Sequence, residues 1–348
     1  MHKLKVLIAA GGSGGHLFPA QQLAAMLSAD CEIAFAGHKL RASPFFAAGI
    51  PFWEIASAQP KRGSWLKFMA ASWRGFWQSV SLLRKYRPDV VIGFGSYHSF
   101  PALLAAMVLR KKLVLFEANC ILGKVNRLFL PAAKKIALQF PLEKKLAKEV
   151  FVPYLPWTGA PKKRVSKKVA RAYFGLDPDR LTLLVFGGSQ GAAFLNQMLP
   201  EALSLLKGEF QVIHLTGKGN TTVSYGKVPA CVKEFEAQMD FAYAASDIAI
   251  CRSGAGTVAE LIRAALPALL IPFPHAAENH QWKNGQFLST RVRGARLLAQ
   301  RKATPEKIAA EIEQLLLERE QCKASLHAWR QQETTDFAAL VREVGASA

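Results

Sequence analysis

The sequence has few cysteines and no long uninterrupted run of apolar residues. Its five cysteines are widely separated among 348 residues and lack the paired spacing of zinc ligands or of a disulfide framework. A reducing compartment therefore fits better than a secreted, disulfide-stabilised protein. No segment reaches the roughly 18 to 20 apolar residues that a membrane-spanning helix needs, and the apolar run near Met1 is too short for a signal peptide. We expect a chain that does not cross a membrane, although it could rest on the surface of one.

Acidic residues are also scarce relative to basic ones. The chain has 45 Lys and Arg against 25 Asp and Glu, a formal net charge of +20 at pH 7. Such an excess attracts anionic partners: nucleic acid, anionic lipid headgroups or phosphorylated substrates. Apolar residues make up 51% of the chain, and this length is typical of about two domains, so the sequence can fill two hydrophobic cores.

Short apolar strands alternate with amphipathic helices in both halves of the chain. A strand at Val6–Ala10 precedes a glycine-rich turn and a helix from Pro19, and the same plan returns after Leu181–Phe186. Between the halves, residues 152–161 contain three prolines, which indicates a domain linker. This pattern predicts an α/β fold with two Rossmann-like, doubly wound domains facing across a cleft. In such sheets ligands bind beyond the carboxyl ends of the strands.

Two glycine-rich turns between a strand and a helix are candidate anion sites. They are Gly11–His16 and Gly187–Gly191. Glycine lets the backbone approach a ligand closely, and the following helix presents free N–H groups. A purely structural turn is the alternative for each. His16 at the helix start is a candidate general base, because histidine ordinarily titrates near neutral pH.

Two further polar segments follow strands in the second half. In Cys251–Thr257 and the helix after it, Thr257 and Glu260 lie one turn apart. Glu260 could accept the hydroxyls of a ribose, or it could simply be an acid favoured near a helix start. The segment His275–Asn284 is rich in amides and imidazoles, which suit sugar hydroxyls. It lacks a complete ligand set for a metal, so we expect no metal and no cofactor.

The segment 60–80 combines large aromatic and basic side chains, which suits a membrane interface with anionic lipids. A core helix is one alternative, and a stacking platform for single-stranded nucleic acid is another. No recognised nucleic-acid module appears in the chain, so we expect no nucleic-acid partner. The side chains expected to meet the membrane are Trp65, Lys67, Phe68, Trp73, Arg74, Phe76 and Trp77.

Taken together, the motifs resemble the MurG family, bacterial transferases that add N-acetylglucosamine from its uridine-diphosphate donor to lipid I, giving lipid II. The resemblance covers essentially the whole chain and rests on segments in the family's order and spacing: GGSGGHLFP (11–19), GFGSYHSFP (93–101), FEAN (116–119), GGSQGA (187–192), CRSGAGTVAEL (251–261) and HQWKN (280–284). The sequence departs from the family pattern at Phe116, Ala118, Ala160 and Lys163.

The resemblance implies a GT-B glycosyltransferase fold and inverting hexosyl transfer in peptidoglycan synthesis. It implies an acceptor-binding, membrane-associated domain at residues 1–157 plus a C-terminal helix at about 328–348, and a donor-binding domain at 158–327. The implied location is the cytoplasmic face of the bacterial inner membrane. Implied partners are UDP-N-acetylglucosamine, lipid I, the anionic membrane surface and cell-wall assembly proteins. The alternatives are a transferase of the same fold with another lipid acceptor, such as diacylglycerol, and a non-enzymatic basic protein that binds nucleic acid or membrane.

The resemblance also assigns roles to residues. His16 becomes the candidate base and Asn119 lines the catalytic cleft. The implied donor-binding residues are Ser13, Gly14, Asn119, Lys163, Gly188, Ser189, Gln190, Ala255, Thr257, Glu260, His280 and Gln281. The implied acceptor-binding residues are Gly12, Gly15, Gly95, Ser96 and Tyr97.

Overall fold

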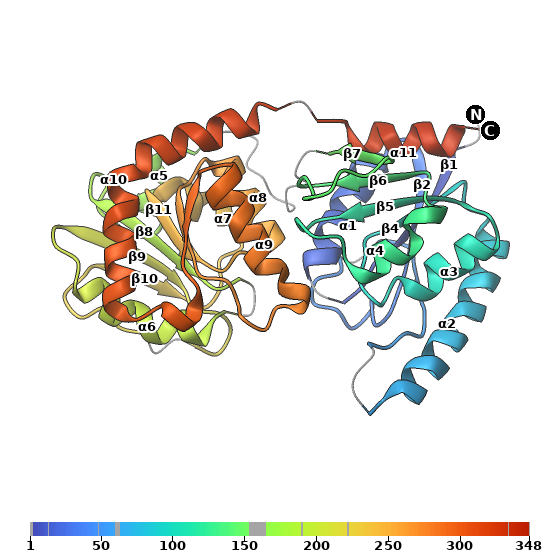
Figure 1. Ribbon diagram of the computed structural model, residues 1–348, viewed down its shortest axis with the longest axis horizontal. Coiled ribbons are helices and arrows are strands. Elements are labelled where there is room, and N and C mark those ends of the chain that lie inside the picture. Colours follow the sequence, from blue (N-terminus) through green and yellow to red (C-terminus); the bar gives the residue numbers. More distant parts are fainter. Residues whose placement is uncertain are drawn as a thin grey trace. The chain divides into compact units, whose positions relative to one another are not determined.

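The computed structural model describes residues 3–12, 14–47, 49–59, 63–152, 165–188, 191–220, 223–332 and 334–347. The chain forms two compact units: unit 1 is Met1–Thr158 with Glu333–Ala348, and unit 2 is Gly159–Gln332 (Figure 1). Each unit is built on one wholly parallel sheet with helices packed against it. The α/β class and the repeated, doubly wound architecture expected from the sequence are confirmed.

Unit 1 has a seven-stranded sheet in the order β3-β2-β1-β4-β5-β6-β7. Its strands are β1 (Leu4–Ala9), β2 (Cys31–Gly37), β3 (Phe52–Glu54), β4 (Val90–Gly93), β5 (Lys112–Glu117), β6 (Lys135–Leu138) and β7 (Glu149–Phe151). Its α-helices are α1 (Gly14–Leu27), α2 (Trp65–Tyr86), α3 (Phe100–Val108), α4 (Lys124–Phe129) and α11 (Phe337–Ala346).

Both faces of this sheet are buried, which explains why its central strands are apolar without interruption. In β1, Val6 and Ile8 join the core with α1 and α11, whereas Leu7 and Ala9 join the core with α2, α3 and α4. The last helix, α11, therefore returns to complete the first unit, and Figure 1 shows it beside that sheet.

Helix α1 begins at Gly14 rather than at the predicted Pro19. The later start was suggested by apolar residues at helical spacing from Pro19 to Leu27. The burial of Gly14, Leu17 and Ala20 shows that packing stabilises the earlier turns. His16 therefore lies in the first turn of the helix, where backbone N–H groups have no partner within the helix.

Unit 2 has a six-stranded sheet in the order β10-β9-β8-β11-β12-β13. Its strands are β8 (Leu181–Phe186), β9 (Phe210–Leu215), β10 (Ala230–Lys233), β11 (Ile248–Cys251), β12 (Ala268–Leu270) and β13 (Ala295–Leu297). Its α-helices are α5 (Lys167–Tyr173), α6 (Ala193–Ser204), α7 (Met239–Ala245), α8 (Ala255–Ala264), α9 (His280–Gln286) and α10 (Pro305–Arg330), and a π-helical turn spans Phe287–Arg291. Helix α10 ends at Arg330. The resemblance to the family had placed the start of a C-terminal helix of the first domain at about residue 328, which lies within α10.

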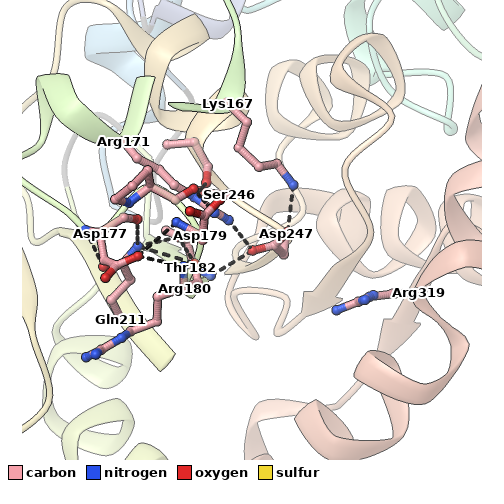
Figure 2. Close-up of polar contacts among 12 residues, drawn as sticks. Lys167, Arg171, Asp177, Asp179, Arg180, Thr182, Gln211, Ser246, Asp247 and Arg319 are labelled. Atoms are coloured by element: carbon pink, nitrogen blue, oxygen red, sulfur yellow. Dashed lines mark hydrogen bonds and ion pairs between the residues drawn. The ribbon is translucent and has the colours of Figure 1, made fainter. Parts of the chain in front are cut away.

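A buried ionic network ties α5 to the start of the unit 2 sheet (Figure 2). The Asp247 carboxylate lies 2.6 Å from Nζ of Lys167 and 2.7 Å from a guanidinium nitrogen of Arg171. It also accepts a hydrogen bond of 2.7 Å from the backbone N–H of Thr182 in β8. The Arg171 side chain is only 4% exposed, so its charge depends on Asp247 for compensation.

We expect Asp247→Ala to lower the free energy of unfolding of the protein by about 3–5 kcal/mol, because it leaves a buried guanidinium without its counter-ion. The matched control is Asp179→Ala, which breaks an exposed ion pair with Lys168 of 3.3 Å and should cost less than about 1 kcal/mol. Urea unfolding followed by circular dichroism measures both. Equal losses in the two variants would contradict the role assigned to Asp247.

Candidate functional site

In unit 1 the candidate base lies at the carboxyl edge of the sheet. Nδ1 of His16 is 2.8 Å from the carbonyl oxygen of Phe94, which follows β4. A carbonyl oxygen can only accept, so Nδ1 donates to it. Gly95 is adjacent, since a Cβ built on it would lie 3.7 Å from Cε1 of His16. The local fold thus fixes the orientation of the His16 ring.

The predicted acceptor-side residues lie on two neighbouring turns. Gly12, after β1, has φ +91°, and Gly95 and Ser96, after β4, have φ +71° and +68°. This left-handed conformation is unfavourable for Ser96 and indicates a backbone held by its surroundings. Tyr97 follows and is half-buried, and Gly15 is exposed in the first turn of α1. Ser13 lies outside the described residues.

Asn119 belongs to a network around a carboxylate that the sequence reasoning did not single out. Glu117, the last residue of β5, is 5% exposed. It accepts hydrogen bonds from the backbone N–H and Nδ2 of Asn119, from the backbone N–H of Gly123 and from Nδ2 of Asn126. The Asn119 side chain is therefore held in place by a buried anion with several donors. The FEAN motif already contained Glu117, but its partners lie farther along the chain.

The departure at Phe116 has a structural explanation. Its ring is buried and lies 5.0 Å from the ring of Phe94 and 5.6 Å from that of Phe337, measured between centroids. The side chain at this position completes an aromatic core beneath the site.

The sequence motifs also did not single out a pair of histidines beside the first glycine turn. Nδ1 of His98 is 2.7 Å from Oγ of Ser57, and its ring stacks on that of His38 with centroids 5.3 Å apart and planes at 16°. Burial, and then the nearby His38, His16 and Lys39, lower the pKa of His98 to about 4. The ring is therefore neutral at pH 7.

In unit 2 the second glycine turn follows β8 and precedes α6. Gly188 has φ +93°, and Gly191 packs so closely that an added Cβ would lie 2.2 Å from the carbonyl oxygen of Thr216. The same oxygen accepts a hydrogen bond of 2.9 Å from Nδ2 of Asn196 in α6. Oδ1 of Asn196 lies 3.1 Å from Nε2 of the buried His214, so a polar chain supports this turn. Ser189, Gln190 and Lys163 lie outside the described residues.

Helix α8 carries the third predicted group. Ala255 is its first residue, and Thr257 and Glu260 follow within the next two turns. The hydroxyl of Tyr243 in α7 donates a hydrogen bond of 2.6 Å to the Glu260 carboxylate. Tyr243 thus orients Glu260, which the sequence reasoning did not anticipate.

The segment from β12 to α9 is tied to the turn after β11. Oγ of Ser253 donates to the carbonyl oxygen of Gln281 at 2.7 Å, and Oε1 of Gln281 accepts from the backbone N–H of Phe273 at 2.9 Å. Nδ1 of His280 lies 2.7 Å from the carbonyl oxygen of Ala277, so it donates there. The predicted residues of the second half that the structure describes therefore follow β8, β11 and β12, which are neighbours in the sheet. Among the described residues, no three His, Cys, Asp or Glu side chains are grouped so that they could hold a metal ion.

Helix α2 has one buried and one exposed face. Gly75, Ser79, Leu82 and Leu83 are buried, whereas several large apolar side chains remain exposed. The exposed ones are Trp65, Leu66, Met69, Trp73 and Trp77, with Trp73 at 65% exposure, while Lys67 and Arg74 are exposed and Phe68 and Phe76 are half-buried. Trp65, Met69, Trp73 and Trp77 recur every fourth residue, so they form one continuous stripe. Within the described part of the chain, none of the helices combines the length and the apolar character needed to traverse a bilayer.

Comparison with known proteins agrees with this arrangement. Residues 6–138 match the Glycosyltransferase family 28 N-terminal domain, and residues 182–341 match the Glycosyltransferase family 28 C-terminal domain. The protein named UDP-N-acetylglucosamine--N-acetylmuramyl-(pentapeptide) pyrophosphoryl-undecaprenol N-acetylglucosamine transferase from Protochlamydia amoebophila is 37% identical over 346 residues, which are 94% of this chain and 92% of that protein. The protein of the same name from Chlamydia pneumoniae is 35% identical and covers 95% of both chains.

Solved structures give the same result. The crystal structure of MurG from Acinetobacter baumannii aligns with 98% of this chain and all of that chain, with a TM-score of 0.78 and 25% identity. The glycosyltransferase SnogD from Streptomyces nogalater has a TM-score of 0.73 over 99% of both chains at 17% identity, which supports the fold alone. The two parallel-sheet units and their domain matches define a glycosyltransferase with the GT-B fold. Within that class, the chain belongs to the MurG family of N-acetylglucosamine transferases.

Proposed function

We propose that this chain transfers N-acetylglucosamine from UDP-N-acetylglucosamine to lipid I, with inversion at the anomeric carbon, and so forms lipid II. The observation that carries the proposal is the similarity to named transferases over nearly the whole chain, at 37% identity across 94% of it. The geometry adds support, because the motif residues that are described follow the strands of two parallel sheets, where ligands of such sheets bind.

In this proposal unit 2 holds the donor. Backbone N–H groups of the turn at Gly188, Ser189 and Gln190 and at the start of α8 bind the diphosphate, because amides at the start of a helix stabilise anions. Glu260, oriented by Tyr243, accepts the ribose hydroxyls. The remaining donor contacts come from Thr257 and Ala255 in α8, His280 and Gln281 in α9, Lys163, and from Ser13, Gly14 and Asn119 in unit 1.

Unit 1 binds the acceptor through the turns at Gly12, Gly15, Gly95, Ser96 and Tyr97. The acceptor hydroxyl oxygen attacks C1 of N-acetylglucosamine while the bond from C1 to the β-phosphate oxygen breaks. The hydroxyl proton passes to Nε2 of His16, and the bonding electron pair leaves with uridine diphosphate. The Phe94 carbonyl supports this role because its hydrogen bond to Nδ1 holds the imidazole in one orientation. The amides around the leaving diphosphate stabilise its developing charge.

We place the acceptor side of the chain on the cytoplasmic face of the membrane, with the exposed stripe of α2 in the lipid interface. Indole rings prefer the boundary between headgroups and acyl chains. Lys67 and Arg74 lie on the same stretch of helix and attract anionic headgroups. The net charge of +20 favours the same location. A chain seated in this way meets a lipid-linked acceptor at the membrane surface.

The proposal predicts that the purified chain forms lipid II from lipid I and UDP-N-acetylglucosamine. The product is detected by mass spectrometry of the lipid fraction. Diacylglycerol offered with the same donor should give no product above background, and UDP-glucose should be a poor donor to lipid I. Glycosylated diacylglycerol without lipid II would favour a transferase of the same fold with another lipid acceptor. No product with any acceptor, together with no saturable binding of the donor, would contradict the proposed function.

The α2 stripe generates a second prediction. Replacing Trp65 and Trp73 with Ser should weaken binding to vesicles of phosphatidylglycerol and phosphatidylcholine by about tenfold or more, because exposed aromatic area is lost from the interface. Co-sedimentation across lipid concentration measures the affinity. The matched control is Leu317→Ser, a similarly exposed apolar side chain on α10, at 79% exposure, which should bind as the unaltered chain does. Unchanged binding of the tryptophan variant, or equal binding to vesicles without phosphatidylglycerol, would refute the assignment.

A further inference from the structure

His98 lies where four strand ends of unit 1 meet. It follows β4, while His38 follows β2, Ser57 follows β3 and Gly12 follows β1. The order β3-β2-β1-β4 makes these strands neighbours, and all of them run parallel. The residues therefore gather at the carboxyl edge of the sheet, beside the turn that carries Gly12.

The imidazole of His98 is held from two sides. Its Nδ1 is 2.7 Å from Oγ of Ser57, which is itself buried, and its ring face stacks on His38. Its backbone N–H also donates to Oγ of Ser96 at 3.0 Å, within the turn after β4. These contacts fix both the position and the plane of the ring.

The opposite edge of the ring points to the glycine turn. A Cβ added to Gly12 would lie 2.9 Å from Cδ2 of His98 and 3.6 Å from Nε2. Gly12 itself is exposed. Within the part of the chain that the structure describes, the hydrogen bonds of the His98 side chain involve Nδ1, and Nε2 has no partner. Nε2 of the half-buried His98 thus lies beside the exposed Gly12.

The surroundings of this edge favour an anion. The groups that face His98 are His38 and Lys39 after β2 and His16 in α1, and each of them disfavours a positive charge on the ring. Glu54, the last residue of β3, accepts backbone hydrogen bonds from Lys39 and Arg41 at 2.8 Å each. A neutral ring at pH 7 is suited to act here as a hydrogen-bond donor, provided that Ser57 donates its hydroxyl proton to Nδ1.

We propose that His98 is a binding residue for a substrate diphosphate: its Nε2–H donates to a phosphate oxygen beside Gly12, while Ser57 and His38 position the ring. This inference rests on the proposed function, and it deepens the acceptor side of that function. Diphosphate is the shared chemistry of the lipid-linked acceptor and of the nucleotide donor. We assign the His98 contact to the acceptor, because its neighbours Gly12 and Ser96 are among the residues proposed to bind the acceptor.

The test compares two variants of the full chain in the transfer assay. His98→Asn keeps a polar group near Nδ1 but removes Nε2, and His98→Gln places an amide N–H near the position of Nε2. We expect the Asn variant to raise the KM for lipid I by about tenfold or more, with kcat and the KM for UDP-N-acetylglucosamine within about twofold, since one hydrogen bond to a charged group is lost. The Gln variant should recover most of the acceptor affinity. His327→Asn, on α10, is the matched control and should change neither KM.

Two results would overturn the inference. One is an unchanged KM for lipid I in a folded His98→Asn variant, and the other is an increase confined to the KM for the donor. A merely structural role for His98 would lower kcat or thermal stability in both variants without recovery by Gln.

A binding measurement keeps this test separate from the proposed function. Inorganic pyrophosphate and geranyl diphosphate are titrated into the chain labelled with 15N-histidine. We expect the Nε2 resonance of His98, assigned from its absence in His98→Asn, to shift saturably with both probes. No shift would contradict the site even if lipid II is formed. A shift without any transfer activity would support the anion site and contradict the proposed function.

Discussion

Every strand in both sheets runs parallel to its neighbours, and this constraint determines where the chemistry of the molecule can lie. In a parallel sheet all carboxyl ends meet at one edge, so residues that follow different strands converge there although they are distant in sequence. In unit 1 the convergence brings His16, His98 and Asn119 to the ends of β1, β4 and β5. In unit 2 it gathers the turn after β8, the start of α8 and the segment that leads into α9. Gly191 shows how tight this edge is, because the carbonyl of Thr216 occupies the space that a side chain would need.

The sequence was sufficient to predict the repeated architecture, because long apolar strands bounded by glycine are distinctive. Short strands were missed: β3 and β7 have three residues each, too few for a period to be visible. The start of α1 was also misjudged, since packing of buried side chains places it at Gly14 rather than at Pro19. Phe337 of α11 contacts Phe94 and Phe116, which ties this last helix to the core of unit 1.

The sequence motifs predicted candidate site residues, but they did not predict the hydrogen-bond partners that position those residues. Asn119 was named, yet its orientation depends on Glu117, which in turn binds Asn126 nine positions away. His98 belongs to the GFGSYHSFP segment, but the sequence does not indicate a role for it. Its hydrogen-bond partner Ser57 is 41 positions away in the chain. Tyr243 and Glu260 are likewise joined only when α7 packs beside α8. Such contacts arise from the order of the strands and helices in space, which no local pattern specifies.

We propose that His16 takes the proton of the acceptor hydroxyl, with its ring held by the carbonyl of Phe94. The pH dependence of kcat for His16→Ala tests it most directly. General-base catalysis contributes about 10²- to 10⁴-fold, so kcat should fall by that order while the KM for UDP-N-acetylglucosamine changes little. A loss of activity toward acidic pH, which a histidine base produces, should also disappear in the variant. Near-complete turnover with an unchanged pH profile would contradict the account.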